Sequence, residues 1–116
     1  MAYPQRLGKF GEKLAEKYFL KKGYKIISRN FHAKEGEIDL ICQKDGFYIF
    51  VEVKTRTSFS FGLPEEAIDE NKREKICLAI EKYLQKNNIV DANFRLDVVC
   101  IFLKENDIRI KHLVNI

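Results

Sequence analysis

The amino-acid sequence predicts an α/β fold with two helices and five strands in the order αβββαββ. Two segments repeat apolar residues at helical spacing, five have the composition or alternation of strands, and Gly, Asn and Asp separate them. The 116 residues are 46% apolar and 33% charged, which is enough apolar material for one core, but the chain is too short for two folded domains. We therefore expect a single domain over residues 1–116.

Both helices are indicated by apolar stripes. The first is expected over residues 5–22, and Gly23 ends it. Its stripe consists of Leu7, Phe10, Leu14 and Tyr18, with Gly11 and Ala15 beside it. The second is expected over residues 71–86, where Asn71 and Glu74 resemble a capping box and two asparagines follow the last turn. Its stripe consists of Ile76, Ala79, Ile80, Tyr83 and Leu84.

Strands are expected over residues 24–31, 37–42, 47–54, 94–103 and 108–114. The third alternates strictly, with Phe47, Ile49, Val51 and Val53 on one face and Tyr48, Phe50, Glu52 and Lys54 on the other. Asp45 and Gly46 before it are typical of a two-residue hairpin turn. Such a turn fixes the register between the second and third strands.

This register places Asp39 opposite Glu52, and Glu37 opposite Lys54, on one face of the sheet. Two adjacent carboxylates repel each other at neutral pH, and a hard divalent cation relieves the repulsion. Mg²⁺ retains several waters, so Asp39 and Glu52 are sufficient protein ligands, and a substrate phosphate completes the shell. Lys54 would stabilise charge developing on phosphorus or orient the attacking water, as in phosphodiester hydrolysis. The alternative is a buried ion pair of Lys54 with Glu52 or Asp39 that only holds the sheet together.

Basic residues are concentrated at the start of the chain. Residues 1–34 contain nine Lys or Arg and two acids, whereas residues 35–116 contain twelve basic and fifteen acidic residues. A basic segment suits nucleic-acid phosphates, and a solvated helix face is the alternative. The longest apolar run, residues 98–103, is far shorter than the roughly 20 residues that span a bilayer, and residues 1–20 lack a signal-peptide pattern. We therefore expect a cytoplasmic protein without a membrane partner.

Cysteine and histidine usage argues against transition-metal chemistry. Cys42, Cys77 and Cys100 lie far apart, form no Cys-x-x-Cys pattern, and are expected to be small core residues. His32 and His112 are isolated in the sequence, so a zinc site or a Ser-His-Asp triad lacks parts.

Two stretches carry a resemblance to a known family: Gly36-Glu37-Ile38-Asp39-Leu40-Ile41 and Phe50-Val51-Glu52-Val53-Lys54-Thr55-Arg56. With the order of the elements, they resemble the PD-(D/E)XK nuclease superfamily, and more narrowly the bacterial YraN family, which is similar to archaeal Holliday junction resolvases. The resemblance extends from Gly11 and Glu12 through Pro64, Glu66 and Ala67 to residues 94–99. Ile38 stands where the superfamily's name has proline.

The resemblance implies a restriction-endonuclease-like αβββαβ core, with a central mixed sheet flanked by helices. It further implies that Asp39 and Glu52 bind Mg²⁺ or Mn²⁺, and that Lys54 is the catalytic lysine. It also implies that Glu12 is a further acid at the metal. A solvated glutamate is the alternative for Glu12, because it lies at the margin of the predicted apolar stripe.

Further charged residues are assigned by position. The candidate phosphate contacts, chosen by charge and nearness to the motif, are Arg56, Lys9, Lys13 and Arg29. Asp97 interrupts an apolar strand. We expect a structural role for it, with Arg95 or a helix N-terminus as its partner.

These patterns favour a Mg²⁺- or Mn²⁺-dependent endonuclease that hydrolyses DNA phosphodiester bonds, at branched or processed DNA. The alternative is a nucleic-acid-binding protein that retains the nuclease fold and does not cleave. A scaffold protein that uses Phe59 and Phe61 as its contact is a third hypothesis. Action on a symmetric junction requires two active sites and therefore a homodimer.

Overall fold

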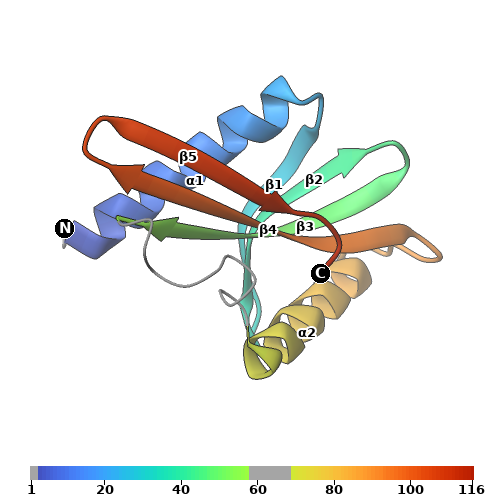
Figure 1. The fold of residues 1–116 in the computed structure, drawn as a ribbon. Helices are drawn as coiled ribbons and strands as arrows, with labels where there is room; N and C mark the ends of the chain where they lie inside the picture. The colour runs from blue at the N-terminus through green and yellow to red at the C-terminus, as the bar shows by residue number, and fades with distance from the viewer. Residues whose placement is uncertain (1–2, 58–68) are drawn as a thin grey trace.

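A computed structural model describes residues 3–57 and 69–116 of the chain (Figure 1). The elements are α1 (Tyr3–Lys21), β1 (Lys25–His32), β2 (Glu37–Lys44), β3 (Phe47–Arg56), α2 (Glu70–Lys86), β4 (Asn93–Lys104) and β5 (Asp107–Leu113). Their order is the predicted αβββαββ order, so the α/β class is confirmed. The hypothesis of a contact through Phe59 and Phe61 lies outside the described residues.

The strands form one five-stranded sheet in the order β1-β2-β3-β4-β5. Neighbouring strands are antiparallel, except β3 and β4, which run parallel. Parallel neighbours need a crossover connection, and the segment that contains α2 supplies it. The mixed sheet that the resemblance implied is therefore present, and the two helices of the described residues, α1 and α2, pack on opposite faces of it (Figure 1).

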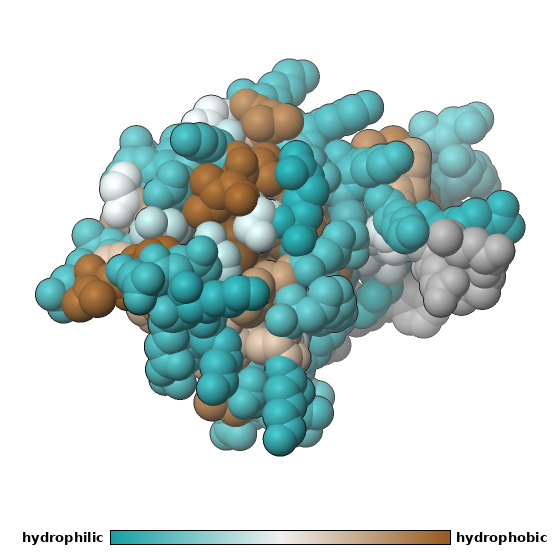
Figure 2. All heavy atoms as spheres, turned by 180° about the vertical axis from the view of Figure 1, so that it is seen from behind, coloured by the Kyte–Doolittle hydropathy of each residue, from teal (hydrophilic) through white to brown (hydrophobic). Residues whose placement is uncertain are grey.

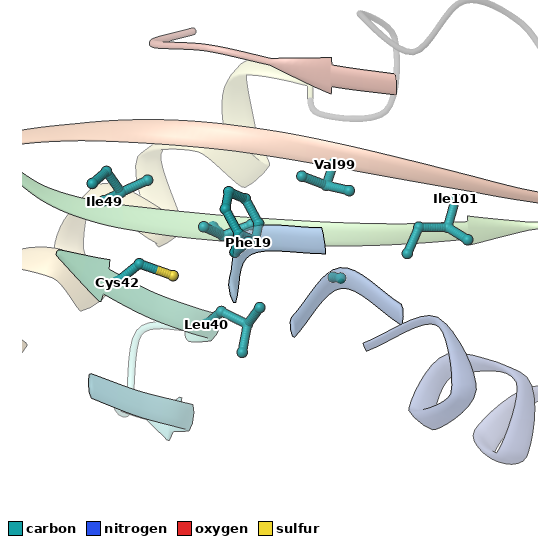
Figure 3. Packing of buried hydrophobic residues seen from close by; sticks show 8 residues of the cluster. Phe19, Leu40, Cys42, Ile49, Val99 and Ile101 are labelled. Carbon is teal, nitrogen blue, oxygen red and sulfur yellow. The ribbon is translucent and has the colours of Figure 1, made fainter. Parts of the chain in front are cut away.

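Side chains alternate along each strand, so the sheet has two apolar faces. Figure 3 shows Phe19 of α1 among side chains of the first face, which include Leu40, Cys42, Ile49, Val99 and Ile101. On the other face, Ile76, Ala79 and Ile80 of α2 pack with Ile38, Ile41, Phe50 and Leu96. The alternation predicted for β3 is confirmed, because Ile49 and Val51 face α1 whereas Phe50 faces α2.

The buried stripe of α1 is shifted relative to the predicted one, although Leu14 and Tyr18 of that stripe are partly buried against the core. Gly11, Ala15 and Phe19 are buried, whereas Phe10 is 49% exposed. Because Gly11 and Ala15 are small, the helix approaches the sheet along this line and buries the Phe19 ring. A Cβ atom at position 11 would overlap Oγ1 of Thr55 near the end of β3, so this approach requires glycine.

The predicted hairpin between β2 and β3 is confirmed. Pairing begins directly at the turn and continues to Leu40 and Val51. Asp45 and Gly46 have φ values of 52° and 81°. These left-handed values are those of a two-residue type I′ turn, which matches the twist of the flanking strands.

The start of α2 corrects the predicted capping box. The N-cap is Asp69, whose Oδ1 accepts a 2.8 Å hydrogen bond from the backbone amide of Lys72. Asn71 lies within the first turn instead. Asn87 forms the C-cap, as predicted. The cap of Asp69 matters for the site because it fixes the turn that carries Lys72.

Two of the three cysteines are buried, as predicted. Burial of Cys42 raises the pKa of its thiol to about 12, so it behaves as an apolar residue, and Cys100 is also buried. Cys77 is exposed, which corrects the prediction for this residue. It follows Ile76 in α2 but lies on the side of the helix turned away from the sheet.

Asp97 is fully buried in β4, and its carboxylate has several partners. It accepts a 3.0 Å hydrogen bond from Nε of Arg95 and a 2.9 Å bond from the backbone amide of Asn115. Its Oδ2 lies 2.7 Å from Nε2 of His112, and Nδ1 of His112 lies 2.9 Å from the Tyr18 hydroxyl. Burial raises the pKa of Asp97, but these hydrogen bonds outweigh burial and lower it. The network joins α1 to β4 and β5, in keeping with the predicted structural role.

Seen from behind, the surface is mainly hydrophilic, with smaller apolar areas between the polar side chains (Figure 2). Neither described helix is long and apolar enough to cross a membrane.

Candidate functional site

The regular alternation of β2 breaks at Asp39. Leu40 and Ile38 would share a face in a regular strand, but Leu40 packs on the α1 side and Ile38 on the α2 side. In β1, Asn30 has a left-handed φ of 50°, and the pairing between the two strands skips Asn30 and Asp39. Both strands therefore depart from regular geometry at the level of Asp39.

The same position ends the pairing of β2 with β3. The paired residues run as far as Leu40 and Val51. Oδ2 of Asp39 then accepts a 2.7 Å hydrogen bond from the backbone amide of Val53. The predicted register is correct up to this point, and the regular pairing of β2 with β3 stops before the predicted opposition of Asp39 and Glu52. The Asp39 carboxylate thus accepts the hydrogen bond that the Val53 amide would donate to a backbone carbonyl of β2 in regular antiparallel pairing.

The regular pairing also stops before the predicted opposition of Glu37 and Lys54. Glu37 pairs with His32 of β1, and its Oε2 lies 3.0 Å from Nδ1 of that histidine. Nζ of Lys54 instead lies 3.3 Å from Oε1 of Glu52, two residues away on the same strand. The separation of the strands thus leaves Lys54 with Glu52 rather than Glu37.

The charge of Glu52 still acts on Asp39. Burial is the largest cause of a raised pKa at Asp39, and the charge of Glu52 is the second. The amide of Val53 lowers this pKa, while Glu12 and Glu37 raise it further, with a result of about 8. The structure therefore gathers an acidic group of four residues from α1, β2 and β3: Glu12, Glu37, Asp39 and Glu52.

Glu12 belongs to this acidic group. Burial raises its pKa, followed by the charges of Glu37 and Glu52. The residue is half-buried, which agrees with a position at the margin of the helix's apolar face. The close approach of Gly11 to Thr55 brings this turn of α1 to the end of β3.

Glu52 is buried and is held by two lysines. Its Oε1 lies 3.3 Å from Nζ of Lys54 and 3.0 Å from Nζ of Lys72 in the first turn of α2. The ion pair of Glu52 with Lys54 that was considered from the sequence is thus present. Lys72 was missed, because no local signal relates the start of α2 to a residue of β3. An N-cap at Asp69 could have been recognised from the sequence, and it would have placed Lys72 in the first turn of α2. It would not have shown that this turn lies next to Glu52.

The four candidate phosphate contacts have different surroundings. Lys9 and Lys13 are exposed on α1, and the charge of Lys9 lowers the pKa of Glu12, so Lys9 lies near the acids. Nη1 of Arg56 donates a 3.2 Å hydrogen bond to its neighbour's carbonyl at the same end of β3. Arg29 is engaged elsewhere, with Nε and Nη2 each 2.8 Å from Oε1 of Glu16.

Asp39 and Glu52 offer ligands that suit magnesium. Within residues 3–57 and 69–116, no group of three or more His, Cys, Asp or Glu side chains is arranged to hold a metal ion. Mg²⁺ is commonly held by one or two carboxylates, with waters and substrate phosphates as the other ligands. The mutual repulsion of Asp39 and Glu52 is what a divalent cation would relieve. The donor set of these two residues therefore fits Mg²⁺ or Mn²⁺, and the role of Glu12 as a further metal ligand stays a prediction.

The model of the uncharacterised protein family UPF0102 matches residues 11–101. The chain belongs to the UPF0102 family. This family, also named YraN, lies within the PD-(D/E)XK-like nuclease superfamily, so the resemblance noted from the sequence is confirmed. A UPF0102 protein of Syntrophomonas wolfei is 44% identical over 111 residues, which cover 96% of each chain. A UPF0102 protein of Caldanaerobacter subterraneus is 42% identical over 94% of this chain and 92% of its own length.

The UPF0102 match includes the acids of the candidate site and the two lysines that contact Glu52. Glu12, Asp39, Glu52, Lys54 and Lys72 lie within residues 11–101. The names of these relatives state a family and no activity. The function is therefore argued from the geometry of the UPF0102 site itself.

Proposed function

We propose that this UPF0102 protein is a Mg²⁺- or Mn²⁺-dependent endonuclease that hydrolyses DNA phosphodiester bonds, including those of branched or processed DNA. The observation that carries the proposal is the place where β2 and β3 separate. Asp39 and Glu52 interact through their charges there, and Lys54 lies 3.3 Å from Glu52. Two carboxylates and a lysine at one point are the groups that this chemistry needs.

Asp39 and Glu52 would hold the cation. When bound, it would polarise the phosphate and lower the pKa of a water molecule. The amide of Val53 fixes Oδ2 of Asp39 and thereby holds the carboxylate in place for a ligand. Lys54 would donate hydrogen bonds to the phosphate oxygens as negative charge builds on them, or orient the attacking water. Lys9, Lys13 and Arg56 would bind neighbouring phosphates and position the strand.

The test is a nuclease assay on linear duplex, single-stranded, forked and four-way DNA, with Mg²⁺, Mn²⁺ or EDTA. Asp39→Asn and Glu52→Gln preserve shape and remove charge, and we expect each to lower cleavage by at least about 100-fold. Binding to the same DNA should survive both substitutions. Equal cleavage by the wild type and both variants would identify a contaminating nuclease and contradict the proposal.

A second candidate is a nucleic-acid-binding protein that does not cleave. The observation that favours it is that Glu52 already has two ammonium partners within the chain. Such a protein would bind DNA with a steep dependence on salt and leave every substrate intact in Mg²⁺ and Mn²⁺. The same assay therefore separates the two functions.

A further inference from the structure

Lys72 makes a contact that the proposed chemistry leaves unexplained. It lies in the first turn of α2, which the Asp69 cap fixes, and its Nζ is 3.0 Å from Oε1 of Glu52. Lys54 lies 3.3 Å from the same oxygen. Two ammonium groups from separate elements thus share one carboxylate oxygen.

This arrangement is incompatible with a cation on the same oxygen. An ammonium group and a divalent cation repel each other, and both compete for the same lone pairs. If Glu52 binds Mg²⁺ through Oε1, at least one lysine must therefore move away. A displaced ammonium group gains most from another anion, and in a nuclease the adjacent anion is the phosphate of the substrate.

The two lysines differ in their freedom to leave. The side chain of Lys54 is 17% exposed and extends from β3, two residues beyond Glu52. The side chain of Lys72 is 37% exposed and reaches Glu52 from the helix on that face. Lys72 is therefore the partner that can exchange with less rearrangement of the sheet.

We propose that Lys72 is an exchangeable partner of Glu52 that couples metal binding to nucleic-acid binding. Without a divalent cation, Lys72 neutralises the buried carboxylate. With the cation on Oε1 of Glu52, Lys72 releases this oxygen and contacts a nucleic-acid phosphate. This inference rests on the proposed function, because it requires Glu52 to be a metal ligand.

The first measurement is calorimetric titration of the free protein with Mg²⁺. Lys72→Met keeps an unbranched side chain that is one atom shorter and removes the competing charge, so we expect it to bind Mg²⁺ about 5- to 10-fold more tightly than the wild type. Lys82→Met is the matched control, because Lys82 is an exposed lysine of the same helix. It should leave Mg²⁺ affinity unchanged.

The second measurement separates coupling from a simple change of local charge. Binding to a short fluorescent DNA duplex is followed over a range of salt concentrations, at low temperature, with either Mg²⁺ or EDTA. In Mg²⁺, Lys72→Met should reduce the slope of the logarithm of the DNA-binding constant against the logarithm of the salt concentration by the amount expected for about one phosphate contact. In EDTA it should not change the slope, because Lys72 is then bound to Glu52.

The outcomes distinguish this inference from the proposed function. Equal Mg²⁺ affinity of the wild type and Lys72→Met, or the same change of slope in Mg²⁺ and EDTA, would overturn the exchange while leaving the nuclease proposal intact. Absence of Mg²⁺ binding in both proteins would overturn the metal site and the exchange together. Mg²⁺ binding by Lys72→Met alone would support the exchange in its strongest form.

Discussion

Oδ2 of Asp39 lies 2.7 Å from the backbone nitrogen of Val53, just beyond the last pair of β2 with β3. The hydrogen bond fixes a carboxylate at a point where two central strands separate. It also lowers the pKa of Asp39, but burial and the charge of Glu52 outweigh it and raise the value to about 8. The fold therefore holds this acid where ionisation is unfavourable without a positive partner.

Asp39→Asn should change the dependence of stability on pH. The carboxyl ionises near 3.8 when unfolded but at about 8 when folded, so the folded state holds the extra proton between these values. The free energy of unfolding of the wild type should fall as pH rises through this window, by up to about 1.4 kcal/mol per pH unit. In Asp39→Asn this contribution disappears, and the variant should be more stable than the wild type near pH 8 in EDTA.

Urea unfolding at several pH values checks this expectation. Asp45→Asn is the control, because Asp45 is an exposed turn residue outside the acidic group. Parallel stability profiles of Asp39→Asn and the wild type would show that Asp39 does not titrate in this window.

Asp97→Asn should destabilise the fold strongly, by about 3–5 kcal/mol. The substitution leaves Arg95 and His112 facing an amide instead of a carboxylate in a buried network. The folded pKa of Asp97 is lowered, so its stabilising contribution is present above the ordinary carboxyl pKa and is lost as pH falls through the lowered value. Urea unfolding at neutral pH measures the loss, and acid titration of the wild type locates the transition. A change below about 1 kcal/mol would mean that the network is not a main support of the fold.

Phe19→Ala and Phe10→Ala form a matched pair that tests the observed stripe of α1. Phe19 is fully buried, so its truncation leaves a cavity and should cost about 3–5 kcal/mol. Phe10 is 49% exposed, so its truncation should cost well under that, about 1 kcal/mol or less. Thermal or urea unfolding of both variants measures these losses of stability. Similar losses in the two variants would contradict the observed stripe and favour the one predicted from the sequence.

Gly11→Ala and Gly8→Ala compare two glycines of the same helix. Alanine favours helix over glycine by about 1 kcal/mol, and Gly8 has open space around the added Cβ, so Gly8→Ala should stabilise the protein. At Gly11 the Cβ would overlap the Thr55 side chain, so Gly11→Ala should destabilise it despite the better propensity. Unfolding curves measure the change in stability of both variants. A stabilising Gly11→Ala would show that α1 can move away from Thr55 without loss of stability.

The order of elements, the hairpin register and the stretches around Asp39 and Glu52 could be predicted from the sequence, because each depends on neighbouring residues. Turn residues set the register near Asp45 and Gly46, and alternation set the faces of β3. Glu12 could be linked to these acids only through the family resemblance.

The break in the alternation of β2 at Asp39 and the contact of Lys72 with Glu52 depended on tertiary structure. A left-handed residue in β1 and an amide of β3 decide how Asp39 is held, and neither lies near it in the chain. Lys72 reaches Glu52 only because α2 packs on that face of the sheet. Local patterns determined which acids approach each other, since strand pairing is nearly local here. The packing of elements that are distant in the chain determined which lysine side chains pair with these acids, because such pairing depends on distances through space.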